Sequence, residues 1–287
     1  MSKPDEISIT HYASTADRWG DMCIANLGNR GIFMIDGGKT CGNLGKPPGD
    51  VEKLFNEIRG KQFDFVLSHW HDDHYGYIKY KTRGQGVPKH IYYGFVIPSI
   101  CEFGNYPPNG CFGPNEQKNV ANGVDIYASA LQNPVDQNDN SMVTVIRVGA
   151  VNYFSFGDAT KETLNFTTSM GSIFNQIQGC TNPIIKLPHH GSHENCQAVF
   201  DRLNPKKCYR FIISGHGGDN IERTIDMFLV GDDNKNRVFL VGKYKSESIN
   251  GFVKRKQNMY GDRFIYTNYA TVNTDGTITV TSWKFQK

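Results

Sequence analysis

Three histidines and two aspartates lie within six consecutive positions of the segment SHWHDDHYG, which runs from Ser68 to Gly76. The chain has only nine histidines, so a third of them are gathered here. His69 and His71 are two positions apart, and in extended backbone such residues point to the same side. Imidazole nitrogen and carboxylate oxygen are common ligands of zinc, manganese and iron. With Asp73 and His74, the H-x-H-x-D-H spacing therefore predicts a metal site. The simpler alternative is a solvated polar loop, which four potential ligands after an apolar strand argue against.

Strand-like segments that end in polar residues recur along the chain. The apolar run FDFVLS leads directly into the histidine cluster, and the sequence places further acids and histidines at strand ends in MIDGG, FSFGDA and PIIKLPHHGSH. A strand end lets a rigid sheet aim side chains at a common point. The order of strands and helices predicts an α/β (α+β) fold of two sheets face to face with helices outside, a four-layer αββα sandwich. One of the helices is expected to begin at Asp50 and end at Gly60.

The absence of repeats, linkers and low-complexity tracts predicts one domain over residues 1–287. Within it, the stretch from about 97 to 140 is rich in Pro, Gly and Asn and carries Phe103, Tyr106 and Phe112. It is too long for a plain connection, so we expect an insertion that serves as a lid or recognition loop. A decorated surface insertion is the alternative.

Composition excludes several classes of protein. The net charge of +3 is not that of a dedicated nucleic-acid binder, although a local basic patch stays open. The N-terminal segment has no apolar signal region and no window is apolar enough to span a membrane, so we expect a soluble cytoplasmic protein. The seven cysteines are widely spread and form no C-x-x-C pair, which argues against a zinc ribbon.

The H-x-H-x-D-H segment resembles the signature of the metallo-β-lactamase fold superfamily. The order of the other motifs is similar too: an acid near the start in MIDGG (Asp36), an aspartate after a strand in FSFGDA (Asp158) and histidines after a later strand in KLPHHGSH. Within the superfamily, FSFGDA, LPHHGS and the closing NTDGTITV resemble the metallo-hydrolase domain of ComEC-type DNA-uptake channel proteins. This resemblance implies two divalent cations, Zn²⁺ or Mn²⁺, with Asp158 between them and Asp36 orienting a ligand histidine.

One departure from the family concerns the first metal. Many members supply a histidine just before the strand that leads to the bridging aspartate, whereas this chain has Asn140 there. The first site would then consist of His69, His71 and Asn140 or water. An amide oxygen is a weaker and harder ligand than imidazole, so we expect weaker binding or a preference for manganese there. The alternative for Asn140 is an Asx turn that opens the strand.

The second site would consist of Asp73, His74 and His189, with Asp158 shared between the sites. Strand alternation lets only one of His189 and His190 face the metals, and we favour His189 because it ends the strand. His190 would then contact substrate or donate a proton. His193 and His216 lie on turns near the same rim and are candidate substrate contacts.

The expected reaction is hydrolysis by a metal-bridging hydroxide, with Asp73, Asp158 and His190 as catalytic residues. The resemblance favours a phosphodiester substrate, as in a nuclease or small phosphodiesterase, so nucleic acid is a possible partner. An alternative is a lactone, β-lactam or other acyl compound, for which the aromatic insertion would suit an apolar substrate. A third is a non-catalytic binding module that retains its metal site.

Overall fold

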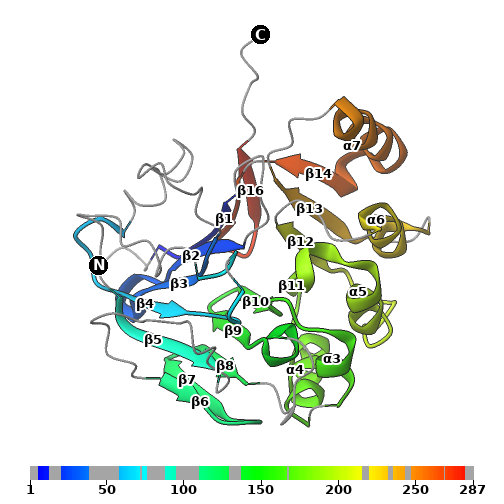
Figure 1. Ribbon diagram of the computed structural model, residues 1–287. Helices are drawn as coiled ribbons and strands as arrows, with labels where there is room; N and C mark the ends of the chain where they lie inside the picture. Colours follow the sequence, from blue (N-terminus) through cyan, green and yellow to red (C-terminus); the bar gives the residue numbers. More distant parts are fainter. Residues whose placement is uncertain are drawn as a thin grey trace.

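The protein is described by a computed structural model that covers residues 6–12, 21–38, 58–71, 73–75, 88–94, 110–128, 137–166, 168–214, 220–231, 235–242, 247–267 and 269–281. Two mixed eight-stranded sheets pack against each other, and helices cover the outer face of the second sheet (Figure 1). The expected architecture of two stacked sheets with flanking helices is confirmed. The helix expected over residues 50–60 lies outside the described residues except for its last turn at Ile58.

The first sheet is built from residues 8–112 and is extended by a hairpin over residues 269–281. The strands between residues 32 and 112 run parallel to one another, whereas the remaining strands pair antiparallel. In spatial order the strands are β16 (Ile278–Thr281), β15 (Tyr269–Asn273), β1 (Ser8–Tyr12), β2 (Met22–Asn26), β3 (Ile32–Gly37), β4 (Phe63–Val66), β5 (Pro88–Gly94) and β6 (Gly110–Phe112).

The second sheet repeats this arrangement, with a parallel part and an antiparallel part. Its strands in spatial order are β14 (Phe264–Thr267), β13 (Arg237–Val241), β12 (Arg210–Ser214), β11 (Ile184–Lys186), β10 (Val151–Ser155), β9 (Val143–Val148), β8 (Val124–Tyr127) and β7 (Gln117–Ala121). The helices that accompany it are α3 (Lys161–Phe166), α4 (Thr168–Gly179), α5 (His193–Phe200), α6 (Ile221–Leu229) and α7 (Glu247–Tyr260).

The apolar core has separate parts on the two faces of each sheet. Between the sheets, alternate residues of facing strands meet, among them Ile9 of β1 and Phe239 of β13. Between the second sheet and its helices, Phe211 of β12 packs on Phe228 of α6, with ring centroids 4.2 Å apart. Burial of apolar surface on both faces explains why these strands read as nearly continuous hydrophobic runs.

The segment expected as an irregular insertion, residues 97–140, contains regular structure. Residues 110–127 form β6, β7 and β8, which occupy the ends of the two sheets, and Gln137–Asn140 form the 3-10 helix η2. Phe112 is fully buried in the core between the sheets. Residues 97–109 and 129–136 lie outside the described residues, so the lid itself stays a prediction.

No helix in the described part of the chain is long and apolar enough to cross a membrane.

Candidate metal centre

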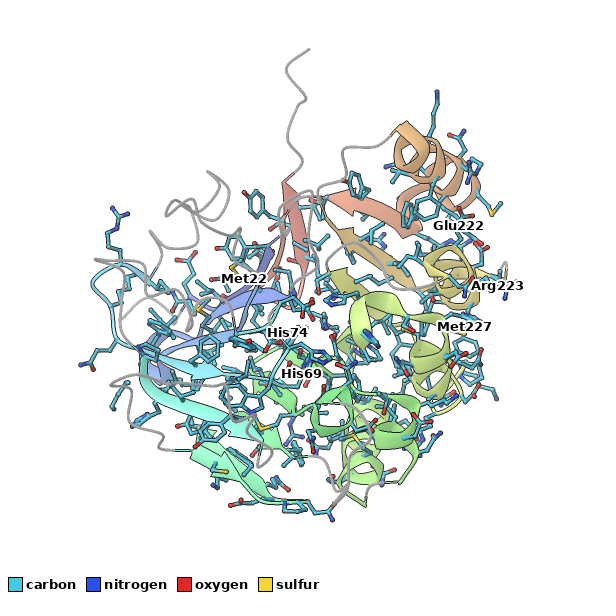
Figure 2. All side chains as sticks on the ribbon, in the orientation of Figure 1. Met22, His69, His74, Glu222, Arg223 and Met227 are labelled. Carbon is cyan, nitrogen blue, oxygen red and sulfur yellow. The ribbon has the colours of Figure 1, made fainter. Side chains whose placement is uncertain are left out.

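The candidate site lies where the carboxyl ends of parallel strands from both sheets meet. The first sheet contributes Asp36 near the end of β3 and the loop after β4, which carries His69 to His74. The second sheet contributes Asp158 after β10 and the residues after β11, which is parallel to β10. Figure 2 shows His69 and His74 near the centre of the molecule, between the two sheets.

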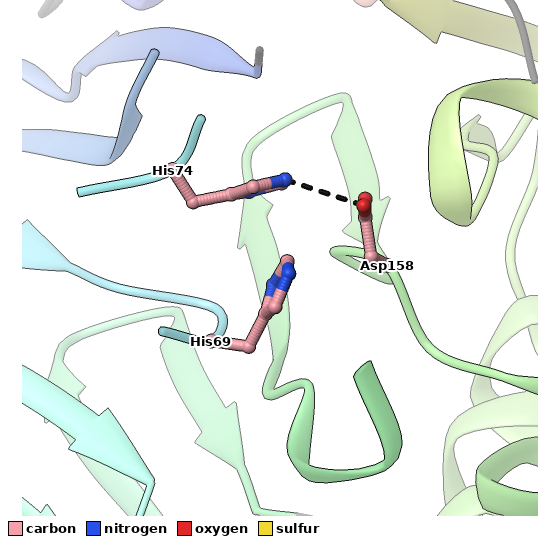
Figure 3. A group of neighbouring side chains, drawn as sticks. All are labelled: His69, His74 and Asp158. Atoms are coloured by element: carbon pink, nitrogen blue, oxygen red, sulfur yellow. Dashed lines mark ion pairs between the residues drawn. The ribbon is translucent and has the colours of Figure 1, made fainter. Parts of the chain in front are cut away.

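His74 contacts one acid through Nδ1 and faces two other acids through Nε2. Its Nδ1 lies 2.9 Å from Asp36 Oδ2, whereas its Nε2 lies 3.3 Å from Asp158 Oδ2 and 3.8 Å from Asp73 Oδ2. Figure 3 shows His74 and Asp158 pointing toward each other, with His69 beside them. A proton on Nδ1 bonded to Asp36 leaves the Nε2 lone pair aimed at the acids, the arrangement common for metal-binding histidines.

His69 presents a second imidazole to the same point. Its Nδ1 lies 3.0 Å from Ser68 Oγ and its ring centroid lies 4.1 Å from that of His74. Within the described residues, the buried Nε2 atoms of His69 and His74 have no hydrogen-bond partner. Burial, together with the neighbouring His74, holds the pKa of His69 well below its usual range, so the ring is neutral and can offer a lone pair.

His190 completes the cluster from the second sheet. It is 2% exposed, and its Nε2 lies 3.3 Å from Oδ2 of both Asp73 and Asp158. Its Nδ1 lies 3.1 Å from the backbone oxygen of Ser214, at the end of β12. Because a carbonyl can only accept, Nδ1 carries a proton and donates it to Ser214, which directs Nε2 toward the two acids.

The charges of the cluster favour added positive charge. Burial disfavours the cationic form of His74, but the fields of Asp158 and Asp36 outweigh it and hold the pKa of His74 well above its usual range. For His190, too, burial is outweighed, first by Asp158, and its pKa is raised to about 10. Protons and metal cations therefore compete for the same buried positions. Three or more ligand atoms lie within 4.8 Å of one another in His69–His74–Asp158 and in Asp73–His74–His190, so these groups have the size of metal sites.

His189, the residue favoured by strand alternation, is not part of these groups. The strand ends at Lys186, and both His189 and His190 adopt left-handed backbone with φ near +50°, so alternation no longer determines which ring faces the acids. Asn195 Oδ1 accepts a hydrogen bond from the backbone N–H of Lys161, which turns its amide nitrogen toward His189 Nδ1 at 2.9 Å. A neutral His189 then carries its proton on Nε2 and has no lone pair left for a cation.

Asn140 ends η2 and is 5% exposed. Neither its amide oxygen nor its amide nitrogen has a hydrogen-bond partner within the described residues, so the Asx turn is not seen. An unpaired buried amide is rare and needs a reason, and a ligand role would supply one.

The other predicted site residues have fewer described contacts with the cluster around Asp158, or none. His71 is half-buried, and its ring centroid lies 4.7 Å from that of His69. His193 is half-buried at the start of α5, and no contact given for the described residues joins it to the cluster. His216 lies outside the described residues.

Two buried charged residues of the site were not assigned to it from the sequence. Asp21, just before β2, forms an ion pair with Lys186, the last residue of β11. Lys186 is 1% exposed, so its ammonium is enclosed by the fold. A lysine inside an otherwise apolar strand was the available signal, because a buried ammonium requires an acid nearby.

Neither a protein-family model nor a curated protein matches the chain. Among solved structures, the chain is similar to Tm1679, a metal-dependent hydrolase of the β-lactamase superfamily, with 11% identity, a TM-score of 0.47 and coverage of 96% of this chain and 100% of that one. A mutant of B. thuringiensis AiiA with N-decanoyl-L-homoserine at its active site shares 12% identity, with a TM-score of 0.37 and coverage of 64% and 93%. A CmlA β-hydroxylase mutant shares 12% identity, with a TM-score of 0.44, over 94% of this chain but only 54% of its own length, so this chain spans about half of it. At such identities the chemistry has to be inferred from the residues of this site.

Proposed function

We propose that the protein is a metal-dependent hydrolase whose site holds two divalent cations. The observation that carries this proposal is the convergence of the buried Nε2 atoms of His69 and His74 on the carboxylate of Asp158. Nitrogen and oxygen ligand atoms that face each other across a buried space need positive charge between them, and a divalent cation can supply it in place of the protons. The proposed ligands are His69, His71, Asp73, His74, Asn140, Asp158 and His190, with His190 in the place expected for His189.

The charge of the cluster supports two cations. The four acids Asp21, Asp36, Asp73 and Asp158 outnumber the single ammonium of Lys186 by three charges. Two divalent cations and one hydroxide ion would neutralise that excess, whereas one divalent cation would leave a net negative charge.

The cations, when bound, would lower the pKa of a water molecule so that it attacks an electrophilic centre at neutral pH. The residues of the chain would hold the cations and border the entrance for substrate. Asp158 Oδ2, which is equally distant from His74 Nε2 and His190 Nε2, is suited to be shared between the two positions. Asp73 is the least buried acid of the cluster, with a side chain 14% exposed, so it would border the entrance for substrate.

A phosphodiester is the substrate that we favour. Two-cation sites recur in enzymes that displace oxygen from phosphorus, because both the attacking and the leaving oxygen gain a counter-charge. The basic run at residues 254–256 gives little support to a nucleic-acid surface. Arg255 pairs with Glu222, and the nearly buried Lys256 bonds to Asp226. Phe112 is buried, so it does not offer the apolar contact that an acyl substrate would need.

The test is metal content followed by turnover. Purified protein is stripped with a chelator, reloaded with zinc or manganese, and assayed on bis-p-nitrophenyl phosphate, nitrocefin and an acyl-homoserine lactone. We expect about two equivalents of metal and turnover of the phosphodiester. Turnover of nitrocefin or the lactone alone would support the acyl alternative, and bound metal with no turnover would support the binding module.

Asp158→Asn is the decisive variant, because it keeps the shape of the side chain and removes its charge. We expect it to lose at least one equivalent of metal and about a thousandfold in rate. Asp262→Asn, which removes an acid from an exposed ion pair with Arg237, is the matched control and should behave as wild type. If Asp158→Asn binds two equivalents as tightly as wild type, the proposed site is wrong.

A further inference from the structure

Behind the proposed ligands lies a second layer of buried charge that joins the two sheets. Asp21 precedes β2 of the first sheet, whereas Lys186 and Ser214 end the neighbouring strands β11 and β12 of the second. The Asp21 carboxylate pairs with the Lys186 ammonium through Oδ2 and accepts a hydrogen bond from the Ser214 hydroxyl through Oδ1. All three side chains are at most 5% exposed.

Lys186 acts on the carboxylate of Asp158. Its ammonium donates to the backbone oxygen of Gly157 at 2.8 Å and lies 3.6 Å from Asp158 Oδ1. Oδ1 is therefore drawn toward the ammonium, and Oδ2 is left facing the histidines at 3.3 Å. The lysine thus selects which oxygen of Asp158 is presented to a cation.

Asp21 acts on the ring of His190. Its Oδ1 lies 3.5 Å from His190 Nδ1, beside the Ser214 carbonyl that accepts from the same nitrogen at 3.1 Å. Two acceptors at one ring nitrogen keep the proton there and turn Nε2 toward the acids. The backbone oxygen of Asp21 also accepts from Gly38 at the end of β3, which fixes its position relative to the first sheet.

We propose that Asp21 and Lys186 are a positioning pair for the metal centre: Lys186 orients Asp158, and Asp21 orients His190. This inference rests on the proposed function, because it assumes that these two residues bind a cation. Neither Asp21 nor Lys186 touches the substrate. Their contribution is to hold one ligand oxygen and one ligand nitrogen in the directions that a cation needs.

The test uses the double variant Asp21→Asn with Lys186→Met. It removes one negative and one positive charge, so the net charge of the cluster is unchanged and any change in metal binding reports orientation. Replacing a buried ion pair by neutral groups of similar size is often tolerated by the fold, and asparagine can still accept from Ser214. We expect the metal-free variant to melt cooperatively near the wild-type temperature and to bind Zn²⁺ about tenfold to a hundredfold more weakly in competition with a chelating dye.

The matched control is Asp226→Asn with Lys256→Met, which removes an ion pair 2.6 Å long between α6 and α7, in which the lysine is 6% and the aspartate 38% exposed. It should leave the Zn²⁺ affinity unchanged. As a second spectroscopic measurement, the visible absorption of the Co²⁺-loaded protein should change in the Asp21–Lys186 variant and not in the control.

Asp158→Asn is measured alongside to separate the two proposals. If it loses metal while the Asp21–Lys186 variant keeps the wild-type affinity and Co²⁺ spectrum, the positioning pair is refuted and the metal site stands. If Asp158→Asn also keeps full affinity, the site itself is refuted. Should the double variant fail to fold, Ser214→Ala removes one anchor of Asp21. We then expect at least about threefold weaker Zn²⁺ binding, and an unchanged affinity would overturn the inference.

Discussion

The carboxylate of Asp36 lies directly behind the ring of His74, with Oδ2 2.9 Å from Nδ1. Its other oxygen accepts a hydrogen bond from the backbone N–H of Ser68 at 2.8 Å. One buried acid thus fixes both the direction of His74 and the start of the loop that carries His69.

Replacing this acid by its amide should weaken metal binding while the site keeps its shape. We expect Asp36→Asn to raise the Kd for Zn²⁺ about tenfold to a hundredfold, because the imidazole loses the acceptor that orients it. Asp64→Asn is the matched control, since Asp64 also lies 2.9 Å from a histidine Nδ1, that of His90, in an ion pair away from the site. Equal affinities for the two variants would show that Asp36 does not act through His74.

Asn140 is expected to limit the affinity of the first metal position for Zn²⁺. Changing Asn140→His supplies an imidazole in place of an amide, so the variant should bind Zn²⁺ at least about tenfold more tightly and prefer it over Mn²⁺. Metal titration with each ion measures both effects. Asn152→His, on the partly exposed side of β10, is the control for an added histidine. An unchanged Zn²⁺ affinity in Asn140→His would exclude residue 140 from the ligand set.

Gly157 allows the chain to approach Ser68 closely. A Cβ on Gly157, where φ is +54°, would lie 2.6 Å from the Ser68 Cβ. Gly157→Ala should therefore displace Asp158 or the His69 loop, destabilise the fold by more than about 1 kcal/mol and weaken metal binding. Gly149→Ala has nearly the same φ, +59°, with nothing within 4 Å of the added Cβ, so it should show backbone strain alone. Urea unfolding and metal titration of both variants test this, and equal losses would count against a steric effect.

His11 should make the fold sensitive to mild acid. Burial lowers the pKa of His11 to about 4, and its Nε2 shares a hydrogen bond of 2.9 Å with the Tyr153 hydroxyl. Below about pH 6.5 the unfolded chain binds a proton at His11, whereas the folded protein does not. The contribution of the neutral His11 to the free energy of unfolding is therefore complete above pH 6.5. It is lost as the pH falls toward 4, by about 3 kcal/mol in all.

Urea unfolding at pH 7 and pH 5 measures this loss. His11→Gln keeps an acceptor for Tyr153 but cannot take up a proton, so its stability should fall less between the two pH values. Carboxyl groups with depressed pKa values, such as Asp158, act mainly below about pH 4. His69, whose pKa is also depressed by burial, adds a loss of the same sign between pH 7 and pH 5, but it is present in both proteins and cancels in the comparison. A wild-type decline that persists in full in His11→Gln would assign the acid sensitivity to other groups.

Much of the fold was predictable because the strands carry strong local signals. The apolar run before the histidine cluster is β4, the hairpin around the MIDGG segment is β2 and β3, and the Asp275-Gly276 turn joins β15 to β16. The strands β6 to β8 were missed because segments such as QKNVA are polar: β7 lies at the edge of its sheet and is only partly buried, so its sequence shows no apolar alternation.

The site was less predictable than the fold, for two physical reasons. Strand periodicity stops where the backbone turns left-handed, so it could not choose between His189 and His190. Asp21 has no neighbouring motif, and its relation to Lys186 exists only after the two sheets have packed.

The pairing of β1 with β15 also bears on how the protein is made. Thr10 and Thr271, whose hydroxyls lie 3.0 Å apart across this pair, are 261 residues apart along the chain. During translation, β1 emerges early and its edge has no partner until β15 follows. The first sheet can close on that side only after β15 has been made, and we expect pairing over so long a sequence separation to slow folding.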